Sequence, residues 1–492
     1  MNATVSKTRT NDSAAPPARA ARPRRALLAC LCVLLLGCGR AGGDGNSSRS
    51  LPSSIAVPTE GVDAVETDNP VARESATDVG ESPTDDLVTR LERQLKRGQF
   101  EDFIDAALNA AADQPASPAL QLFKAEALLA AGRNDEAELA AQLAASLAQD
   151  DANPTIASHA MKLWATARFR QNKALDDPLA ADLLERLPAD DPVGQMLRFW
   201  FDTLGQRTVY RVAGSSDAAP VELRPARAAA GTVPEQLNAI EARINGVAVP
   251  LAFVDTGTQQ TLMTVKAAEA TGVVLGPSST RLVGFAGLNA RPGVIETLEL
   301  GSLVLHDVPV LVGNSPPLVA LKGQMALGTE LMHHVRFTID YPARRVFAAR
   351  AEAPRIAPVQ RPAWQIPVWT FSQACLSRGQ LPDGTMARVL VDTGDRAGSF
   401  VSTRWARRNL PDFQRPPATV VFKFKQRNLK LPEMALGSES LLDWPIVDTI
   451  PRVLERLDTV DLLLGHDLLG SYVVTIDLEQ RMLQLIKPPA VD

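Results

Sequence analysis

The hydrophobic and polar positions change their pattern three times along the 492 residues. Residues 26–36 form an apolar run, and residues 39–85 contain few large apolar side chains. From 86 to 206, apolar residues recur at the spacing of one face of an α-helix. From 207 to 492, short β-branched segments are separated by Gly, Pro and Asn at intervals of about ten residues, which is typical of an all-β domain. We therefore expect a helical region followed by a larger β-rich region.

The first 37 residues have the pattern of a secretory signal. A pair of arginines precedes the apolar run, which is too short to span a bilayer but fits the centre of a signal peptide. The run ends in LLGC at residues 35–38, which resembles the bacterial lipobox. The resemblance implies removal of residues 1–37, lipidation of Cys38 and, because Gly39 rather than Asp follows, attachment to the outer membrane of the cell envelope, facing the periplasm. The alternatives are a plain signal peptide or a weak membrane anchor.

Residues 38–85 follow the expected cleavage point and are rich in Gly, Ser, Pro, Thr, Asp and Glu. Such a composition cannot bury enough apolar surface to offset the entropy that is lost on folding. We expect a flexible linker that holds the folded body away from the lipid, with the lipid as the only contact to the membrane.

Within the helical region, residues 119–137 resemble a tetratricopeptide repeat. In that repeat a glycine, here Gly132, follows the first helix, and an acidic residue with alanine, here Glu136 and Ala137, opens the second. The resemblance implies a groove for a peptide or a partner protein. The alternative is a helical spacer that packs against the domain behind it.

Two copies of Asp-Thr-Gly stand at the ends of apolar strands in the β-rich region. The first loop contains Asp255, Thr256, Gly257 and Thr258, and the second contains Asp392, Thr393, Gly394 and Asp395. Each strand follows a turn sequence, Asn-Gly at 245–246 or Asp-Gly at 383–384, that suits a tight hairpin. One such motif proves little, because it can arise by chance in a chain of this length, but two in the same context indicate a repeated unit.

The spacing of other residues supports this repeat. Gly328 follows Asp255 by 73 residues, and Gly465 follows Asp392 by the same 73 residues. Each glycine comes after two apolar residues, and each unit closes on a similar strand, at 337–340 and at 474–477. The sequence therefore predicts two duplicated halves, 207–352 and 353–492, joined by a proline-rich hinge.

This pattern resembles the aspartic peptidases of the pepsin and retropepsin clan, in particular bacterial retropepsin-like proteins. The resemblance implies a bilobal all-β acid-protease fold, with a site formed inside one monomer by a pseudo-dimer of the two halves. Asp255 and Asp392 would be the catalytic pair, with no cofactor and no metal. Thr256 and Thr393 would hydrogen-bond between the two loops. The remaining loop residues would support them: Gly257, Thr258, Gly394, Asp395, Gly328 and Gly465.

The two halves differ in ways that bear on activity. The first contains Gly284, Phe285, Ala286 and Gly287, which can form a flap over a peptide or protein substrate, or simply a hairpin turn. Asp395 adds a third carboxyl group three residues after Asp392. If it points at Asp392 it favours a catalytically inactive scaffold that binds peptides, and if it points to solvent it favours an aspartic-type endopeptidase.

The composition excludes several other functions. The formal net charge is −5, and it falls to about −10 without the basic residues 1–37, which argues against a nucleic-acid partner. The four cysteines and five histidines show no metal-ligand spacing. On the lipoprotein interpretation Cys375 is the only thiol left in the mature chain, and it lacks the His and Asn pattern of a cysteine nucleophile. These features leave the paired aspartates as the candidate chemistry.

Overall fold

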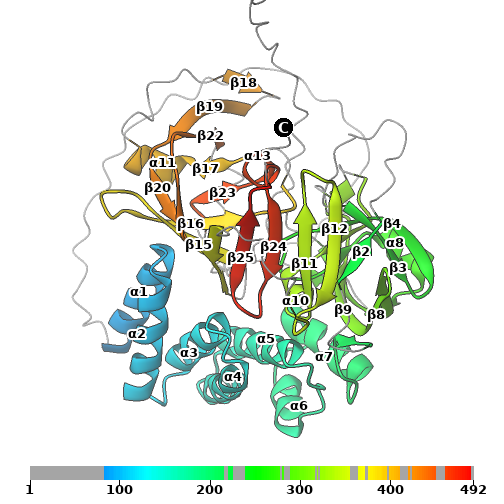
Figure 1. Cartoon of the computed structure of the whole chain (residues 1–492). Helices are drawn as coiled ribbons and strands as arrows, with labels where there is room; N and C mark the ends of the chain where they lie inside the picture. The colour runs from blue at the N-terminus through cyan, green and yellow to red at the C-terminus, as the bar shows by residue number, and fades with distance from the viewer. Residues whose placement is uncertain are drawn as a thin grey trace, which may run out of the picture.

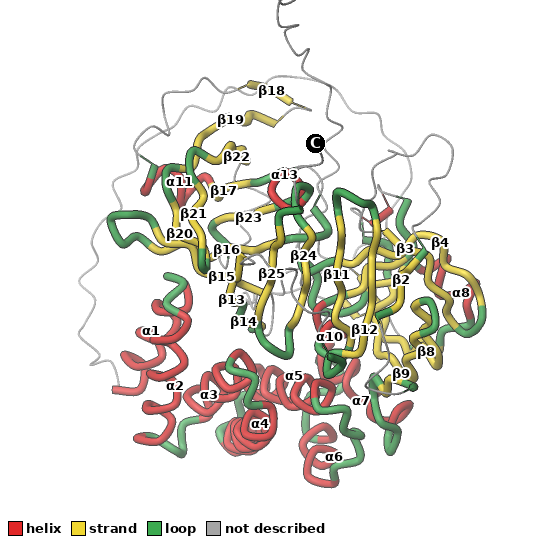
Figure 2. Tube along the Cα trace, in the orientation of Figure 1, coloured by secondary structure: helices red, strands yellow, loops and turns green. Residues whose placement is uncertain are grey.

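The computed structural model of the protein is shown in Figure 1. It describes residues 83–214, 220–224, 239–276, 280–281, 289–315, 318–319, 322–354, 364–371, 375–395, 398–410, 419–421, 424–449 and 460–488. The helices of the first part of the chain lie together along one side of a larger β-rich body (Figure 2). The prediction of a helical region followed by a β-rich region is therefore confirmed.

The helical region contains these helices: α1 (Pro83–Lys96), α2 (Phe100–Asp113), α3 (Pro118–Ala130), α4 (Asn134–Asp150), α5 (Pro154–Arg170), α6 (Pro178–Glu185) and α7 (Pro192–Leu204). Four of them begin with a side-chain oxygen that accepts a backbone N–H of the first turn, followed by a proline at the first helical position. Both features favour a helix start. These cap residues are Ser117, Asn153, Asp177 and Asp191.

Consecutive helices from α1 to α5 pack against one another in chain order. Between α3 and α4 the backbone turns at Gly132, whose φ of +75° is accessible to glycine at little cost. The tetratricopeptide likeness of this pair stays a prediction. Among the described residues, no helix is both long and apolar enough to cross a membrane.

The first half of the β-rich body has the following strands: β1 (Arg211–Val212), β2 (Val221–Leu223), β3 (Ala239–Ile244), β4 (Val247–Val254), β5 (Leu262–Met263), β6 (Val274–Leu275), β7 (Thr280–Arg281), β8 (Asn289–Leu300), β9 (Leu303–Val312), β10 (Met325–Leu327), β11 (Val335–Asp340) and β12 (Arg345–Arg350). Its short helices are α8 (Val265–Thr271) and α10 (Thr329–Met332). The predicted Asn245–Gly246 turn joins β3 to β4, and both residues have positive φ, as a type I′ turn requires.

The second half has these strands: β13 (Trp364–Pro367), β14 (Trp369–Thr370), β15 (Cys375–Gln380), β16 (Met386–Val391), β17 (Phe400–Ser402), β18 (Thr419–Val421), β19 (Phe424–Leu431), β20 (Met434–Leu436), β21 (Glu439–Leu441), β22 (Trp444–Thr449), β23 (Leu462–Leu464), β24 (Val473–Asp477) and β25 (Met482–Ile486). Its short helices are α11 (Thr403–Asn409) and α13 (His466–Leu469). Central pairings match those of the first half: β4 runs parallel to β10 as β16 does to β23, and β10 is antiparallel to β5 as β23 is to β17.

A sheet of six strands joins the two halves, in the order β13-β25-β24-β11-β12-β2. At its centre β11 of the first half is antiparallel to β24 of the second, with Thr338 opposite Thr475. The hydroxyl groups of these two threonines are 3.1 Å apart, and the residues are separated by 137 positions. The halves therefore meet about a local two-fold axis, and each contributes half of this shared sheet (Figure 1).

The helical region packs against both halves rather than standing apart from them. Phe100 of α2 lies with its ring centre 5.1 Å from that of Trp369 and 5.0 Å from that of Phe371, both in the second half. Trp200 of α7 donates its indole N–H to the carbonyl of Gly293 in the first half, at 3.1 Å. The helices and the β-rich body therefore share a buried core.

Candidate active site

The two Asp-Thr-Gly loops occupy equivalent places at the ends of paired strands. Asp255 follows β4, and its N–H donates to the carbonyl of Leu327 at the end of β10, at 3.1 Å. Asp392 follows β16, and its N–H donates to the carbonyl of Leu464 at the end of β23, at 2.9 Å. Each aspartate is thus attached to a parallel strand pair in the buried centre of its half.

Thr256 and Thr393 connect the two loops through a reciprocal set of hydrogen bonds. The N–H of Thr256 donates to the Thr393 hydroxyl at 3.1 Å, and the N–H of Thr393 donates to the Thr256 hydroxyl at 3.0 Å. Each hydroxyl in turn donates to a strand carbonyl of the other half, Thr256 to Val391 at 2.6 Å and Thr393 to Val254 at 2.9 Å. The structure therefore brings together the two threonines as the resemblance implies.

Gly257 and Gly394 each contact both aspartates. The N–H of Gly257 donates to Oδ1 of Asp255 at 2.9 Å, and the N–H of Gly394 donates to Oδ1 of Asp392 at 2.8 Å. Each glycine also faces the opposite aspartate: a methyl group on Gly257 would lie 2.6 Å from Oδ2 of Asp392, and one on Gly394 would lie 2.5 Å from Cγ of Asp255. Only glycine at both positions lets the two carboxyl groups approach one another.

Gly328 and Gly465 pass beneath the loops with equally little space. A methyl group on Gly328 would lie 2.5 Å from the carbonyl oxygen of Gln259, and one on Gly465 would lie 2.7 Å from that of Gly398. The four glycines picked out by the sequence are therefore required by close backbone or carboxyl contacts.

The two carboxyl groups are buried, with only 4% of Asp255 and 1% of Asp392 exposed. Burial is the main cause that raises the pKa of Asp255, to about 6. Burial raises the pKa of Asp392 well above its usual range, and the negative charges of Asp255 and Asp395 raise it further. Because two neighbouring buried carboxylates repel, the pair retains a proton to a higher pH than an exposed aspartate does.

The carboxyl groups of Asp255 and Asp392 interact directly, and each one shifts the pKa of the other. Within the described part of the chain, no N–H or O–H group donates to Oδ2 of Asp392, although this oxygen is buried. A proton shared between the two carboxyl groups would satisfy that oxygen. The arrangement therefore provides one protonated and one ionised carboxyl group side by side, which is the chemistry needed to activate a water molecule.

The position of Asp395 excludes one of the two orientations that the sequence analysis considers. It is only 2% exposed, so it does not point to solvent. Its N–H donates to Oδ1 of Asp392 at 3.2 Å, and its Oδ2 lies 2.8 Å from the position of a methyl group on Gly465. Thr258, at the equivalent place in the first loop, is also buried. Asp395 therefore packs beneath the second loop, from which its charge acts on Asp392.

Other residues considered in the sequence analysis either fall outside the described part of the chain or are buried in its packing. The flap residues Gly284, Phe285, Ala286 and Gly287, like Cys38, lie outside the described residues. Cys375 is a buried free thiol whose pKa is raised by burial to about 12. His334 stacks on Tyr210, with ring centres 4.7 Å apart, so it is part of the packing. Across the described ranges, no cluster of three or more His, Cys, Asp or Glu side chains is arranged to hold a metal ion.

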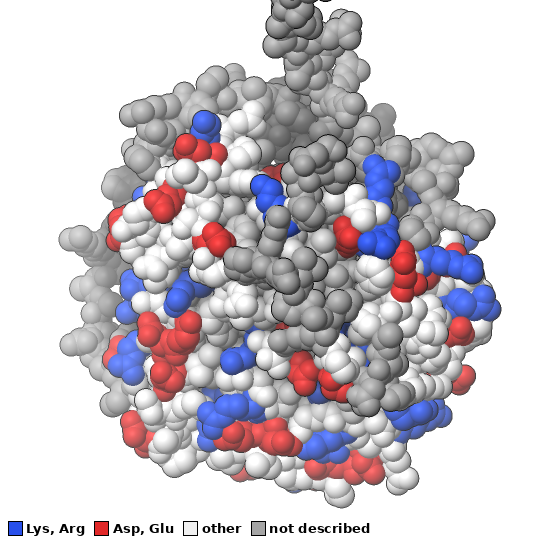
Figure 3. Space-filling model, viewed as in Figure 1, with Lys and Arg blue, Asp and Glu red and all other residues white. Residues whose placement is uncertain are grey.

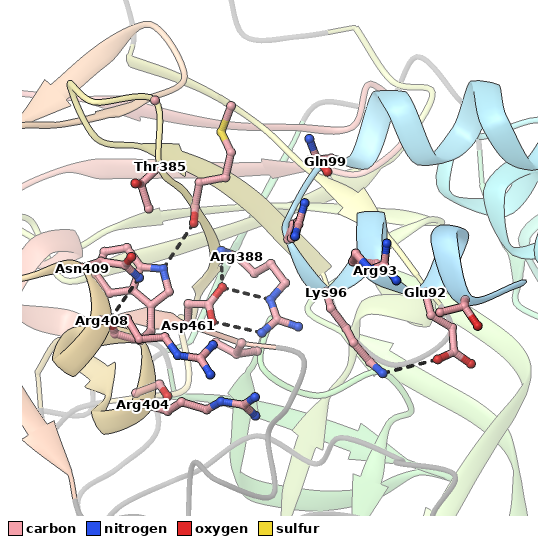
Figure 4. Close-up of a pocket in the computed structure, with 17 residues that line it drawn as sticks. Glu92, Arg93, Lys96, Gln99, Thr385, Arg388, Arg404, Arg408, Asn409 and Asp461 are labelled. Atoms are coloured by element: carbon pink, nitrogen blue, oxygen red, sulfur yellow. Dashed lines mark hydrogen bonds and ion pairs between the residues drawn. The ribbon is translucent and has the colours of Figure 1, made fainter. Parts of the chain in front are cut away.

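A groove with a volume of about 930 Å³ lies between α1 and the second half, away from the two aspartates. Figure 4 shows Arg93 and Lys96 on the side of α1, and Arg404 and Arg408 on the side of α11, with Arg388 and Asp461 between them. Arg388 is paired with Asp461 at 2.9 Å. The groove is therefore a basic surface that is separate from the paired carboxyl groups.

Comparison with known proteins gives a family match over the first loop. Residues 240–331 match the model of a family described as aspartyl protease. The matched segment contains Asp255 and Gly328 and ends before Asp392, so it covers the first loop and its supporting strands. Among solved structures, the chain matches the crystal structure of aspartic proteinase from Irpex lacteus with 11% identity and a TM-score of 0.31, over 55% of this chain and 98% of that chain. No curated protein matches.

The sequence analysis assigned no role to Gln259 and Glu330, which lie directly beneath the first loop. Gln259 follows Thr258 in the chain, and its side-chain amide donates to Glu330 at 3.1 Å. The sequence does mark Glu330 as a candidate, because Glu330 and Asp467 are acidic residues at the same distance after Gly328 and Gly465. Their partners, however, are far away in the sequence.

Proposed function

We propose that the chain is an aspartic endopeptidase of the bacterial cell envelope, with Asp255 and Asp392 as the catalytic pair. The observation that supports this most directly is the pair of buried, interacting carboxyl groups on two loops that are linked by Thr256 and Thr393. The likeness of residues 240–331 to aspartyl proteases supports the same reaction class.

In the proposed reaction, the ionised carboxylate takes a proton from a water molecule as the water oxygen attacks the carbonyl carbon of a peptide bond. The protonated carboxyl group donates a hydrogen bond to the carbonyl oxygen and stabilises the charge that develops there. The C–N bond then breaks as the leaving nitrogen receives a proton from the pair. The products are a carboxylic acid and an amine, and the pair returns to its singly protonated state.

The first experiment mixes protein lacking residues 1–38 with a peptide library between pH 3 and pH 8 and identifies products by mass spectrometry. Asp255→Asn and Asp392→Asn should each abolish cleavage, because each removes one of the two required carboxyl groups. Asp383→Asn is the matched control, since Asp383 is exposed in the turn before β16. Cleavage that survives either dyad substitution, or that is lost equally in the control, contradicts the proposal. Sedimentation equilibrium should show that the active species is a monomer.

The proposed location rests on the lipobox-like sequence at 35–38, with Cys38 as the lipidated residue, the linker 38–85 as a spacer, and the outer membrane as the site of attachment. In bacterial cells the chain should fractionate with membranes, and Cys38→Ala should shift it to the soluble fraction. Mass spectrometry of the amino-terminal peptide should find acyl chains on Cys38. An unmodified Cys38 in membrane-bound protein overturns this assignment.

A second candidate function is a non-catalytic scaffold that binds peptides, and the basic groove supports it. Two exposed arginines and a lysine from two elements, Arg93, Arg408 and Lys96, line the groove together with Trp405. Such a surface favours an acidic peptide or partner protein at the helical region, through charge attraction. On the face of the molecule in Figure 3, by contrast, acidic and basic side chains are interspersed over the helices. A folded protein that binds an acidic peptide but cleaves nothing at any pH would favour this function.

A further inference from the structure

A buried ion pair connects the helical region to the loop that carries Asp255. Arg170, the last residue of α5, donates from Nε to Oε2 of Glu330 at 3.1 Å and from Nη2 to Oε1 at 3.0 Å. The two residues are 160 positions apart. Their side chains are only 2% and 0% exposed. This paired, two-bond geometry is the most specific form of arginine–carboxylate contact.

Glu330 also forms hydrogen bonds with the first loop. Its Oε1 accepts the side-chain amide of Gln259 at 3.1 Å, and its N–H donates to the carbonyl of Gln259 at 3.0 Å. Gln259 directly follows Thr258, so the chain of contacts runs from α5 to the loop that contains Asp255. On the other side, Nη1 of Arg170 donates to the carbonyl of Leu129 in α3, at 3.2 Å. The arginine is therefore fixed by two helices.

The second loop has a different support. The residue equivalent to Glu330 is Asp467, which accepts the hydroxyl of Ser399 at 2.7 Å and its N–H at 3.0 Å. Ser399 belongs to the second half itself, so this polar contact does not involve the helical region. The two catalytic loops are alike in their backbone contacts but differ in what lies beneath them.

A buried ion pair contributes little net stability, because removing two charges from water offsets most of their attraction, but it fixes the arrangement of the groups it joins. We propose that Arg170 and Glu330 are positioning residues for the proposed peptidase, and that through them the helical region holds the Asp255 loop in its active geometry. On this proposal, which rests on the proposed function, the helical region is a required part of the active site.

Hydrogen exchange tests this coupling without depending on peptidase activity. Arg170→Met keeps an apolar stem of similar length but removes the guanidinium group. Amide exchange of residues 256–261 should then rise about 10-fold or more, while residues 393–395 should remain protected. Arg168→Met is the matched control: Arg168 lies two residues earlier on α5, but its partner at 2.6 Å is Glu138, inside the helical region. This control should leave both loops protected.

A double variant separates positioning from folding. Arg170→Met alone leaves the buried charge of Glu330 without its partner, which destabilises the whole protein. Arg170→Met combined with Glu330→Met removes both charges, so the melting temperature should recover while the first loop continues to exchange rapidly. Equal protection of the first loop in the wild type and in Arg170→Met overturns the proposal. Recovery of loop protection together with the melting temperature in the double variant also overturns it.

Where the wild type cleaves peptides, kcat adds a second readout. A loop displaced by about 1 Å can lower the rate by about 100-fold. We expect kcat to fall by a factor of this order in Arg170→Met and in the double variant, with KM little changed. An inactive wild type with the expected exchange pattern would refute the proposed function and leave the coupling intact. An active wild type whose kcat is unaffected by Arg170→Met would support the proposed function and refute the coupling.

Discussion

Replacing Thr256 with Val tests whether the contact between the two loops holds the halves together. Valine has nearly the shape of threonine and is favoured in extended backbone, so the substitution removes the hydroxyl and little else. That hydroxyl donates to the carbonyl of Val391 at 2.6 Å and accepts the N–H of Thr393 at 3.0 Å. Both partners are buried, and both lose this bond.

The size of the effect follows from these two groups. Leaving a buried donor or acceptor without a partner costs about 1–3 kcal/mol, so the two together predict a loss of about 2–6 kcal/mol in the free energy of unfolding. Thr338→Val is the matched control at the other contact on the two-fold axis. Its hydroxyl is half-buried and, within the described part of the chain, its one hydrogen-bond partner is the Thr475 hydroxyl at 3.1 Å, so its loss should cost about 0.5–1.5 kcal/mol.

The assay is urea unfolding of the chain without residues 1–38, followed by both circular dichroism and tryptophan fluorescence. Coincident transitions with an unchanged slope justify reading the shift in midpoint as a change in stability. Thr256→Ser, which restores the hydroxyl, should recover most of the loss. The reasoning is refuted if Thr256→Val costs no more than Thr338→Val, or if serine and valine at 256 are equally destabilising.

Three further outcomes follow. The native state holds protons on Asp255 and Asp392 above the pKa of about 3.9 of an exposed aspartate, so stability should fall as the pH rises from about 4 to 6 and beyond. Asp392→Asn should therefore flatten the dependence of Tm on pH and raise Tm near pH 7; an unchanged dependence speaks against a buried pair. Gly394→Ala should lower peptidase activity by about 100-fold or more in folded protein, because its methyl group would lie 2.5 Å from Cγ of Asp255; retained activity would exclude the close contact. Because burial raises the pKa of Cys375 to about 12, iodoacetamide should label it only after unfolding, as mass spectrometry can check, and rapid labelling of native protein would contradict its burial.

Local sequence patterns were sufficient to predict the paired loops. Asp255 and Asp392 each follow an apolar strand, and Gly328 and Gly465 come at the same distance after them. These features can be read from the sequence itself, because they involve adjacent residues and the equal spacing of the two repeats. The structure accordingly brings the predicted loop residues together, although nothing in their pattern specifies the buried position of Asp395.

The contacts of the helical region could not be predicted in this way. Arg170 stands at the end of a helix, where a basic side chain commonly interacts with the helix dipole at the surface. Its partner Glu330 is 160 residues away. The periodicity of apolar residues identifies a buried face but not the surface against which it packs. The contact of Phe100 with Trp369 could not be predicted for the same reason.

The shared six-stranded sheet limits how this protein can be divided. Without the second half, β11 would lose its partner β24 and expose an unpaired edge from Phe337 to Asp340. An open edge of apolar strand readily accepts another strand, including the same strand from a second copy. Each half on its own would thus have an unpaired strand edge that favours self-association. Because both halves lie in one chain, both edges are paired within one molecule, and the two loops can differ in sequence, as Thr258 and Asp395 do.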